Sequence, residues 1–273
     1  MRPPTGPASH LRSRVRRALA LWGVAAYLDL MFVTRGPKQA LGYAVTDATL
    51  SLAAASGTLL LAERFAGIGT WTRHQVIFML GYAVLASGIL SVLFGYNILF
   101  ISRRLGRGQF DHTLLQPQPL WLALLTEGFM PFSGAAELVP GMGLLLWALQ
   151  RLDVAVTPGW IALLLLNLTA SAAVVWSFSY VWGSLAFWAP RAAEEISSSA
   201  MRMMSQLRSF PLDGAGGLLS GGLLSVLPAG FVAWYPCRAL LGIDATPSAV
   251  FVTPLAAAVA LTVALGVFGL GRT

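Results

Sequence analysis

The amino-acid sequence predicts an all-α polytopic membrane protein. We expect six transmembrane helices, an N-terminal interfacial helix and a short cytoplasmic helix between two of the spans. Of the 273 residues, 56% are hydrophobic and only 11% are charged, and the mean hydropathy is +0.71. Backbone polar groups inside a bilayer must be hydrogen-bonded within the chain, and helices satisfy this requirement.

Six apolar runs are each about long enough to cross a hydrocarbon layer of roughly 30 Å as a helix. They are Leu41–Ala62, Val76–Phe100, Phe129–Leu149, Trp160–Trp188, Leu218–Tyr235 and Ala249–Leu270. With both termini in the cytoplasm, fourteen of the eighteen Lys and Arg residues fall on the cytoplasmic side. This asymmetry follows the positive-inside rule, so we expect cytoplasmic N and C termini. The polar connections 101–119 and 190–217 are then cytoplasmic, whereas 236–247 lies outside.

The chain divides at about residue 40. We expect residues 1–40 to form a cytoplasmic tail and an interfacial helix, and residues 41–273 to form the six-span domain with its loop at 101–119. The apolar stretch Ala18–Val33 is short for a span, contains Asp29, and as a seventh span would place the basic N-terminus outside. No small-residue cleavage site follows it, which disfavours a signal peptide. We therefore expect it to lie in the cytoplasmic interface, with a membrane-spanning helix as the alternative.

The net charge of +7 does not point to nucleic acid, because the positive charges are distributed as topology signals. A basic cytoplasmic surface faces anionic lipid headgroups, which accounts for the charge without a nucleic-acid partner.

Residues suited to catalysis or metal binding are scarce. None of the three histidines, His10, His74 and His112, has a second histidine or cysteine at metal-ligand spacing. Cys237 is the only cysteine, so an internal disulfide is impossible and a packing role is expected. The chain lacks a glycine-rich phosphate-binding loop ending in Lys-Ser or Lys-Thr. We expect no catalytic residue, no metal site and no bound cofactor, and any ATP must be used by another chain.

Acidic residues near or inside spans are costly in lipid and often functional. Glu137, between two prolines, is the best candidate for a polar group that faces a cavity and takes part in substrate or proton handling. Asp47 and Glu127 lie near cytoplasmic span ends, where we expect them either to extend toward the interface or to pair with nearby cytoplasmic arginines. Glu63 lies at an outer end and is expected to pair with Arg64.

The fifth apolar run has small residues, a proline and an aromatic end. Pro228 is expected to kink the helix, and Trp234 and Tyr235 resemble an outer interfacial belt. The features fit ordinary membrane packing, and they also fit a span that bends during transport. The candidate residues for a translocation path or gate are Glu137, Pro228, Tyr235 and Pro236.

The polar segment 101–119 is predicted to contain a short amphipathic helix. It begins with Arg103, Arg104 and Arg107, followed by a break at Gly108. After the break, Phe110, Leu114 and Pro117 fall at positions i, i+4 and i+7. An ordered helix between two spans suggests that another protein docks there.

The order of these features resembles the permease subunits of type-2 ABC transporters, in the branch of uncharacterised ABC permeases. The loop carries the pattern G-x-x-D-x-x-L-L-x-P, formed by Gly108, Asp111, Leu114, Leu115 and Pro117. A later stretch reads FPLDGAGGLLSGGLLSVLPAGFVAWYP. The resemblance covers nearly the whole chain.

The resemblance implies that segment 101–119 is a coupling helix that inserts into a groove of a cytoplasmic ABC ATPase subunit. Phe110, Leu114 and Leu115 would make the apolar contact, the three arginines would form a polar rim, and Asp111 would cap the helix. A second permease chain, identical or different, would complete the translocation path in the cytoplasmic membrane of a bacterial-type cell. The expected function is export of an unidentified substrate; the alternative is a secondary transporter driven by an ion gradient.

Overall fold

The computed structural model describes residues 7–65, 67–95, 128–214, 221–222, 224–244 and 246–271. The longer helices in these ranges are α1 (Pro7–Arg35), α2 (Pro37–Arg64), α3 (Arg73–Phe94), α7 (Leu138–Leu149), α8 (Pro158–Ser184), α9 (Pro190–Leu207), α11 (Trp234–Leu240) and α12 (Val252–Leu270). Short 3-10 helices are η2 (Gly134–Glu137), η3 (Leu185–Phe187), η4 (Leu212–Gly214), η5 (Pro228–Phe231) and η6 (Pro247–Phe251). Two strands, β1 (Gly67–Ile68) and β2 (Trp71–Thr72), pair as an antiparallel hairpin.

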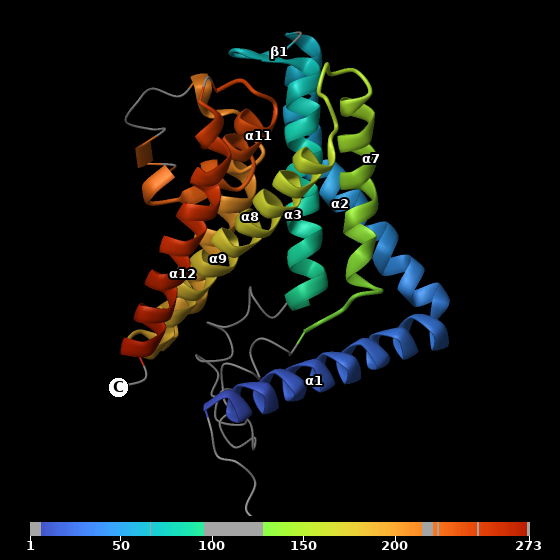
Figure 1. Ribbon diagram of the computed structural model, residues 1–273. Coiled ribbons are helices and arrows are strands. Elements are labelled where there is room, and N and C mark those ends of the chain that lie inside the picture. Colours follow the sequence, from blue (N-terminus) through green and yellow to red (C-terminus); the bar gives the residue numbers. More distant parts are fainter. Residues whose placement is uncertain are drawn as a thin grey trace, which may run out of the picture.

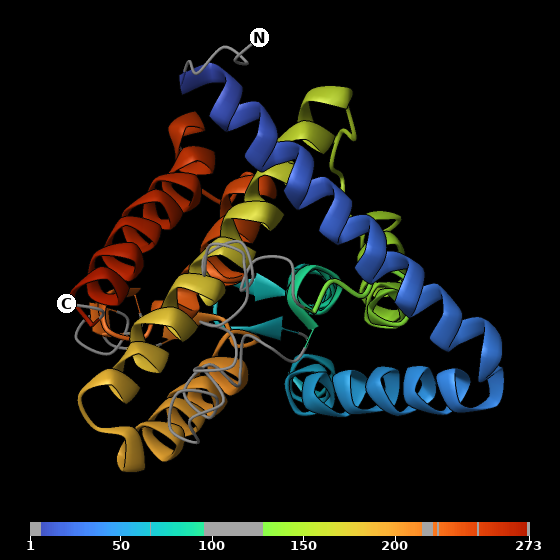
Figure 2. The ribbon, with the colours of Figure 1, turned by 90° about the horizontal axis from the view of Figure 1, so that it is seen from below.

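The long helices run between two ends of the molecule (Figure 1). We call the end that carries β1 and β2 the hairpin end, and the end crossed by α1 the elbow end. Helix α1 lies across the elbow end and meets α2 at Gly36. Seen from below, α1 and α2 form a V, and the ends of α3 and α7 lie between its arms (Figure 2). This transverse placement of α1 agrees with an interfacial helix better than with a span.

Helix α3 forms the centre of the core. It begins at a capping box, in which Thr72 and Gln75 satisfy each other's backbone N–H groups. Its apolar stretch is 72% buried, compared with 11% for α2 and 17% for the helix ending at Leu270. Tyr82 and Ser171 share a buried hydrogen bond of 3.0 Å between their hydroxyl groups, which connects α3 to α8. The exposed apolar faces of α2 and α12 are left for lipid or another chain.

Glycines allow α3 and α7 to pack with their backbones close together. A Cβ atom on Gly81 would lie 2.6 Å from the backbone nitrogen of Leu145, and one on Gly141 would lie 2.8 Å from that of Leu85. Small residues are the usual means by which helices approach closely in lipid, where van der Waals contact replaces the hydrophobic effect. This contact fixes α7 against the core helix.

Helix α9 runs from the elbow end to the hairpin end, contrary to the sequence prediction. It begins beside η3, and the η4 turn that follows it reaches the hairpin end, where Asp213 accepts hydrogen bonds from Trp71 and Trp234. The prediction that 190–217 lies wholly on the side opposite 236–247 is therefore wrong. The helix was missed because polar residues on one of its faces lower its mean hydropathy.

The apolar run Leu218–Tyr235 does not form one spanning helix in its described part, so its assignment as the fifth span is wrong. Leu227 has φ −115° and ψ 90°, an extended conformation, and η5 begins at Pro228. Steric contact with a proline ring disfavours helical geometry for the preceding residue, which explains the break. After a second break at Ala233, α11 forms near the hairpin end. The run therefore folds as short helical pieces.

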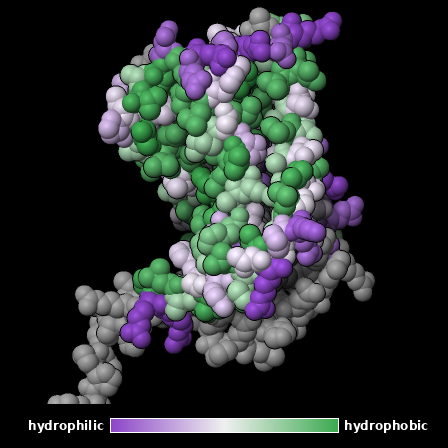
Figure 3. All heavy atoms as spheres, turned by 90° about the vertical axis from the view of Figure 1, so that its right-hand side faces the viewer, coloured by the Kyte–Doolittle hydropathy of each residue, from purple (hydrophilic) through white to green (hydrophobic). Residues whose placement is uncertain are grey.

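The surface supports a membrane location. Five described helices are long and apolar enough to cross a bilayer: Val15–Arg35, Pro37–Arg64, Arg73–Phe94, Pro158–Phe187 and Pro247–Leu270. Gly134–Leu149 is a shorter apolar helix. Hydrophobic residues gather in the middle of the face seen in Figure 3, and hydrophilic residues lie toward its two ends. A belt of this kind is what a bilayer requires of its proteins.

Candidate functional site

The predicted coupling residues lie outside the described part of the chain. They are Arg103, Arg104, Arg107, Gly108, Phe110, Asp111, Leu114, Leu115 and Pro117. Their role remains a prediction.

The segment that follows this loop is held by α1. The Asp29 carboxylate accepts hydrogen bonds from the backbone N–H of Phe132 (2.8 Å), the backbone N–H of Ser133 (3.1 Å) and the hydroxyl of Ser133 (2.6 Å). Trp22 stacks on Phe129, with ring centroids 5.6 Å apart. Asp29 is only 7% exposed, and its three donors offset the cost of burying the carboxylate. Sequence reasoning noted Asp29 only as an interruption of an apolar stretch and missed this contact.

Glu137 lies at the end of η2 and lines a cavity inside the V of α1 and α2. The hydroxyl of Ser91 donates a 3.0 Å hydrogen bond to the Glu137 carboxylate. We call this space of about 340 Å³ the elbow cavity. It is lined by Phe32, Tyr43, Asp47, Ser91, Gly95, Met130, Ser133, Gly134 and Glu137.

Two acidic residues of the sequence analysis therefore come together in this cavity. Asp47 is half-buried on α2, ten residues from the start of that helix, and faces the same space as Glu137. The expectation that Asp47 pairs with an arginine has no support among the described residues. The sequence suggested that Glu63 pairs with Arg64. In the structure it pairs with Arg73, at 2.7 Å.

At the hairpin end, a second group of residues connects three segments that are distant in the sequence. We call Trp71, Asp213, Trp234, Arg238 and Asp244 the Asp213 cluster. Asp213 accepts hydrogen bonds from the indole N–H groups of Trp71 and Trp234, the latter at 2.7 Å, and forms an ion pair with Arg238. Arg238 also donates to Asp244 at 2.8 and 3.0 Å, and its guanidinium lies 5.2 Å from the centre of the Trp234 ring.

The electrostatics of this cluster favour the charged forms. Burial alone lowers the pKa of Arg238, but the hydrogen bonds to Asp244 and the charge of Asp213 outweigh burial, so the pKa is raised. Arg238 therefore stays charged throughout the physiological pH range. The cluster holds η4, α11 and the β-hairpin together.

The predicted gating residues Tyr235 and Pro236 lie in α11, near this end. Pro228 lies deeper, because η5 packs against the middle of α8, where the hydroxyl of Ser171 donates a 3.2 Å hydrogen bond to the Phe231 carbonyl. Pro228 begins η5, and Pro236 is buried within α11. The Tyr235 ring packs between Phe231 and Trp234, with centroid distances of 5.9 and 6.0 Å. The structure therefore does not bring the four predicted path residues together at one location.

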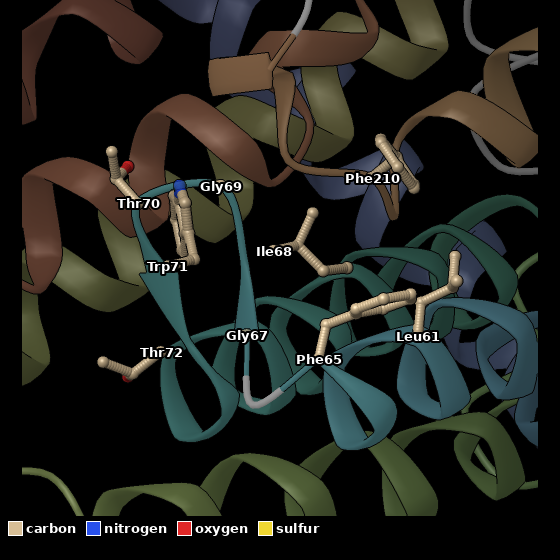
Figure 4. A pocket seen from close by; sticks show the side chains of 9 residues that line it. All are labelled: Leu61, Phe65, Gly67, Ile68, Gly69, Thr70, Trp71, Thr72 and Phe210. Atoms are coloured by element: carbon tan, nitrogen blue, oxygen red, sulfur yellow. The ribbon is translucent and has the colours of Figure 1, made fainter.

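An open groove of about 590 Å³ adjoins the Asp213 cluster. Figure 4 shows Phe210 facing Ile68, Leu61 and Phe65 across the groove, with the glycine-rich hairpin turn beside them. Its walls are mostly apolar, and the labelled side chains carry no ionisable group. We therefore do not expect this groove to catalyse a reaction.

Helix α9 has one polar face that the sequence analysis did not use. Ala193, Ser197, Met201 and Met204 are buried on its inner face. The exposed side chains on the helix include Glu195, Ser198, Arg202, Ser205 and Gln206. A polar face at this depth is unfavourable against lipid and suits contact with water or another polar surface.

Within the described residues, no group of three or more His, Cys, Asp or Glu side chains is arranged to hold a metal ion. Cys237 is buried and has no disulfide partner.

Comparison with protein families gives a match to the ABC-2 family transporter protein over residues 51–272. The chain belongs to the ABC-2 transporter family. No curated protein and no solved structure matches it. The match confirms the resemblance to type-2 ABC permeases, and it includes the loop 101–119 and every described helix after α2. The chain is therefore an ABC transporter permease and a multi-pass membrane protein, and α1 precedes the matched region.

Proposed function

We propose that this permease is the membrane-spanning subunit of an ATP-driven exporter in the cytoplasmic membrane of a bacterial-type cell. The family match over residues 51–272 carries the proposal. Membrane chains of this family are generally non-catalytic. We therefore assign ATP binding and hydrolysis to a separate cytoplasmic ATPase subunit. The permease binds no cofactor in this account, and its substrate is unidentified.

The loop 101–119 is the proposed contact with that ATPase. Leu114 and Leu115 enter an apolar groove, and the preceding arginines form the polar rim. The support from the described structure is the fixed position of the chain just after the loop, at Phe132 and Ser133. Motion of the loop would be passed on to α1 through Asp29, and to α3 through the 2.9 Å hydrogen bond from Met130 N–H to Val92 C=O.

The proposed topology has six crossings, made by α2, α3, α7, α8, α9 and α12, with α9 in place of the predicted fifth span. Counted along the sequence, twelve of the eighteen Lys and Arg residues then belong to the elbow end. The positive-inside rule makes this the cytoplasmic end, with both termini there. Helix α1 lies in the interface at the same end.

The polar face of α9 supports a second permease chain as partner. Two such faces, brought together across a dimer interface, would enclose a hydrated path and remove both from lipid. The partner is either a second copy or a related chain. The exposed apolar face of α12 would remain in contact with lipid.

The transport cycle follows from these placements. ATP binding closes the ATPase dimer and moves the coupling loops, and the helices tilt as nearly rigid bodies. Export requires the hairpin end to open, so the Asp213 cluster and the segment containing Pro228, Tyr235 and Pro236 are the proposed gate. An ion-gradient-driven secondary transporter, the alternative from the sequence, is not favoured by the family.

The test is capture of a co-expressed ABC ATPase by the purified permease. Wild-type protein should retain the ATPase, and Leu114→Asp/Leu115→Asp should lose it because charge enters an apolar groove. Ala155→Asp/Val156→Asp is the matched control, since both residues are exposed at the opposite end. Capture that survives the leucine changes would show that the loop assignment is wrong.

A further inference from the structure

The elbow cavity has the size and walls of a small-molecule site. Its volume of about 340 Å³ lies within the range of ligand pockets. Phe32 from α1 and Tyr43 from α2 meet near the apex of the V, one to two helical turns from Gly36, with ring centroids 6.2 Å apart. Both rings are partly exposed, at 37% and 54%, so the cavity is accessible from the side between the two helices.

Two carboxylates face this largely apolar space, and no cationic side chain of the described residues is in contact with either. Glu137 receives one hydrogen bond, from Ser91, and Asp47 has no hydrogen-bond partner among the described residues. Neither forms an ion pair with a described Lys or Arg, although the charge of Arg208 attracts Glu137 at longer range. Carboxylates near apolar surroundings are costly unless hydrogen bonds, a proton or a positive charge compensate them, and a bound cation is the compensation that a ligand can supply.

The combination of aromatic faces and carboxylates selects one kind of ligand. Aromatic rings attract cations through their negative faces, and the attraction grows when water is excluded. Among the described residues, no third metal-ligating side chain joins the two carboxylates, and the aromatic walls offer a hard metal ion little in place of its water ligands. The two carboxylates would repel an anion. A neutral lipid would leave the negative charge of Asp47 without compensation.

We propose that the elbow cavity binds a lipophilic organic cation that enters from the bilayer between α1 and α2. Asp47 and Glu137 supply the compensating charge, and Phe32 and Tyr43 supply the aromatic contact. Asp29 is a positioning residue, because its carboxylate is engaged by Phe132 and Ser133 and fixes the wall of the cavity. The binding site rests on the cavity alone; the step from ligand to exported substrate rests on the proposed function.

The experiment measures equilibrium binding of radiolabelled tetraphenylphosphonium to the full-length permease in detergent micelles, with empty micelles subtracted. Tetraphenylborate, of similar shape and opposite charge, is the ligand control. Wild type should bind tetraphenylphosphonium saturably and tetraphenylborate not at all. Asp47→Asn/Glu137→Gln should weaken binding of the cation at least ten-fold, because both changes keep the shape and remove the charge.

Matched variants separate the site from general effects. Asp153→Asn removes one exposed charge at the hairpin end and should leave the affinity unchanged. Tyr43→Phe should retain binding and Tyr43→Leu should reduce it several-fold. Equal binding of both ions, no saturable binding by wild type, or wild-type affinity in the Asp47/Glu137 variant would overturn the proposal. Each result is independent of ATPase capture, so failure here leaves the proposed function standing.

Discussion

At the scale of single residues, two aspartates join parts of the chain that are far apart in sequence. Asp29 connects α1 to the segment at Phe132 and Ser133, and Asp213 connects η4 to the hairpin and α11. Both carboxylates are largely removed from water, and their hydrogen bonds replace those lost from water. These contacts fix the two ends of the permease.

Asp213→Asn should destabilise the permease by about 1–3 kcal/mol, because it leaves Arg238 with one acidic partner in a mostly buried site. The side chains of Arg238 and Asp213 are 21% and 10% exposed. Thermal unfolding in detergent measures the change. Glu63→Gln, which breaks the exposed Glu63–Arg73 pair, is the control and should cost less than about 1 kcal/mol. Equal losses for both variants would contradict the structural role of Asp213.

Asp29→Asn should loosen the segment after the loop. An asparagine accepts through one oxygen only, so at least one of the three hydrogen bonds is lost. Amide hydrogen exchange at Phe132 and Ser133 should then accelerate by roughly ten-fold, which corresponds to about 1.4 kcal/mol for a local opening. Exchange in α8 is the internal control and should not change. Unaltered exchange at both amides would show that Asp29 does not hold this segment.

At the scale of helices, the contact between α3 and α7 depends on glycine, and the orientation of α9 depends on its two faces. Gly81 and Gly141 permit backbone contact that no larger residue allows. On α9, Met201 and Met204 are buried and Arg202 is exposed. Each helix is positioned by its side-chain pattern, and neither pattern is captured by mean hydropathy.

Gly141→Ala should lower thermal stability by about 1–3 kcal/mol, because the new Cβ lies 2.8 Å from the Leu85 nitrogen and separates the helices. Gly143→Ala, two residues along the same helix, is the matched control. A Cβ there has nothing within 4 Å, so stability should be equal or higher by up to about 1 kcal/mol, as alanine favours helix. The reverse order of the two effects would contradict the packing of α3 on α7.

Cysteine substitution tests the proposed path along α9. Ser198→Cys and Ser205→Cys should react with a charged, membrane-impermeant thiol reagent in the assembled transporter, because thiolates form only where water reaches. Ser197→Cys, buried one position away, should react at least about ten-fold more slowly. The native Cys237 is buried and gives little background. Similar rates at exposed and buried positions would rule out a hydrated path along this helix.

Much of the architecture follows from the sequence, and the exceptions have physical causes. The apolar runs predict α2, α3, α8 and α12 because these helices lack a polar face. The polar face of α9 hides it from a hydropathy count. Conversely, Leu218–Tyr235 was wrongly predicted as a span: it is apolar enough to cross the bilayer, but its helix is broken at Pro228. The run suggested a span because composition does not record where the helical geometry ends.

Some residues of the candidate sites could be predicted from the sequence, and others could not. Glu137 was found because an acid in an apolar run is informative by itself. Its companions in the elbow cavity, Phe32 and Tyr43, come from the junction of two helices that only the fold brings together. The Asp213–Arg238 ion pair and the Asp29–Ser133 contact likewise depend on tertiary placement. Spacing along the chain carries no signal for any of them.

At the scale of the whole molecule, the permease is a set of helices fixed at both ends and open on one polar face. The elbow end contains the elbow cavity. At the hairpin end, the Asp213 cluster joins η4, α11 and the β-hairpin. In the proposed function, an ATPase supplies energy at the elbow end and a second permease chain covers the polar face of α9.

The most direct test is ATP hydrolysis by the ATPase partner, measured in lipid nanodiscs with and without the permease. Wild-type permease should change the hydrolysis rate several-fold, and Ala155→Asp/Val156→Asp should have the same effect. With Leu114→Asp/Leu115→Asp, the rate should equal that of the ATPase without permease. A hydrolysis rate that is identical with and without wild-type permease, for every ATPase that it captures, would contradict the account.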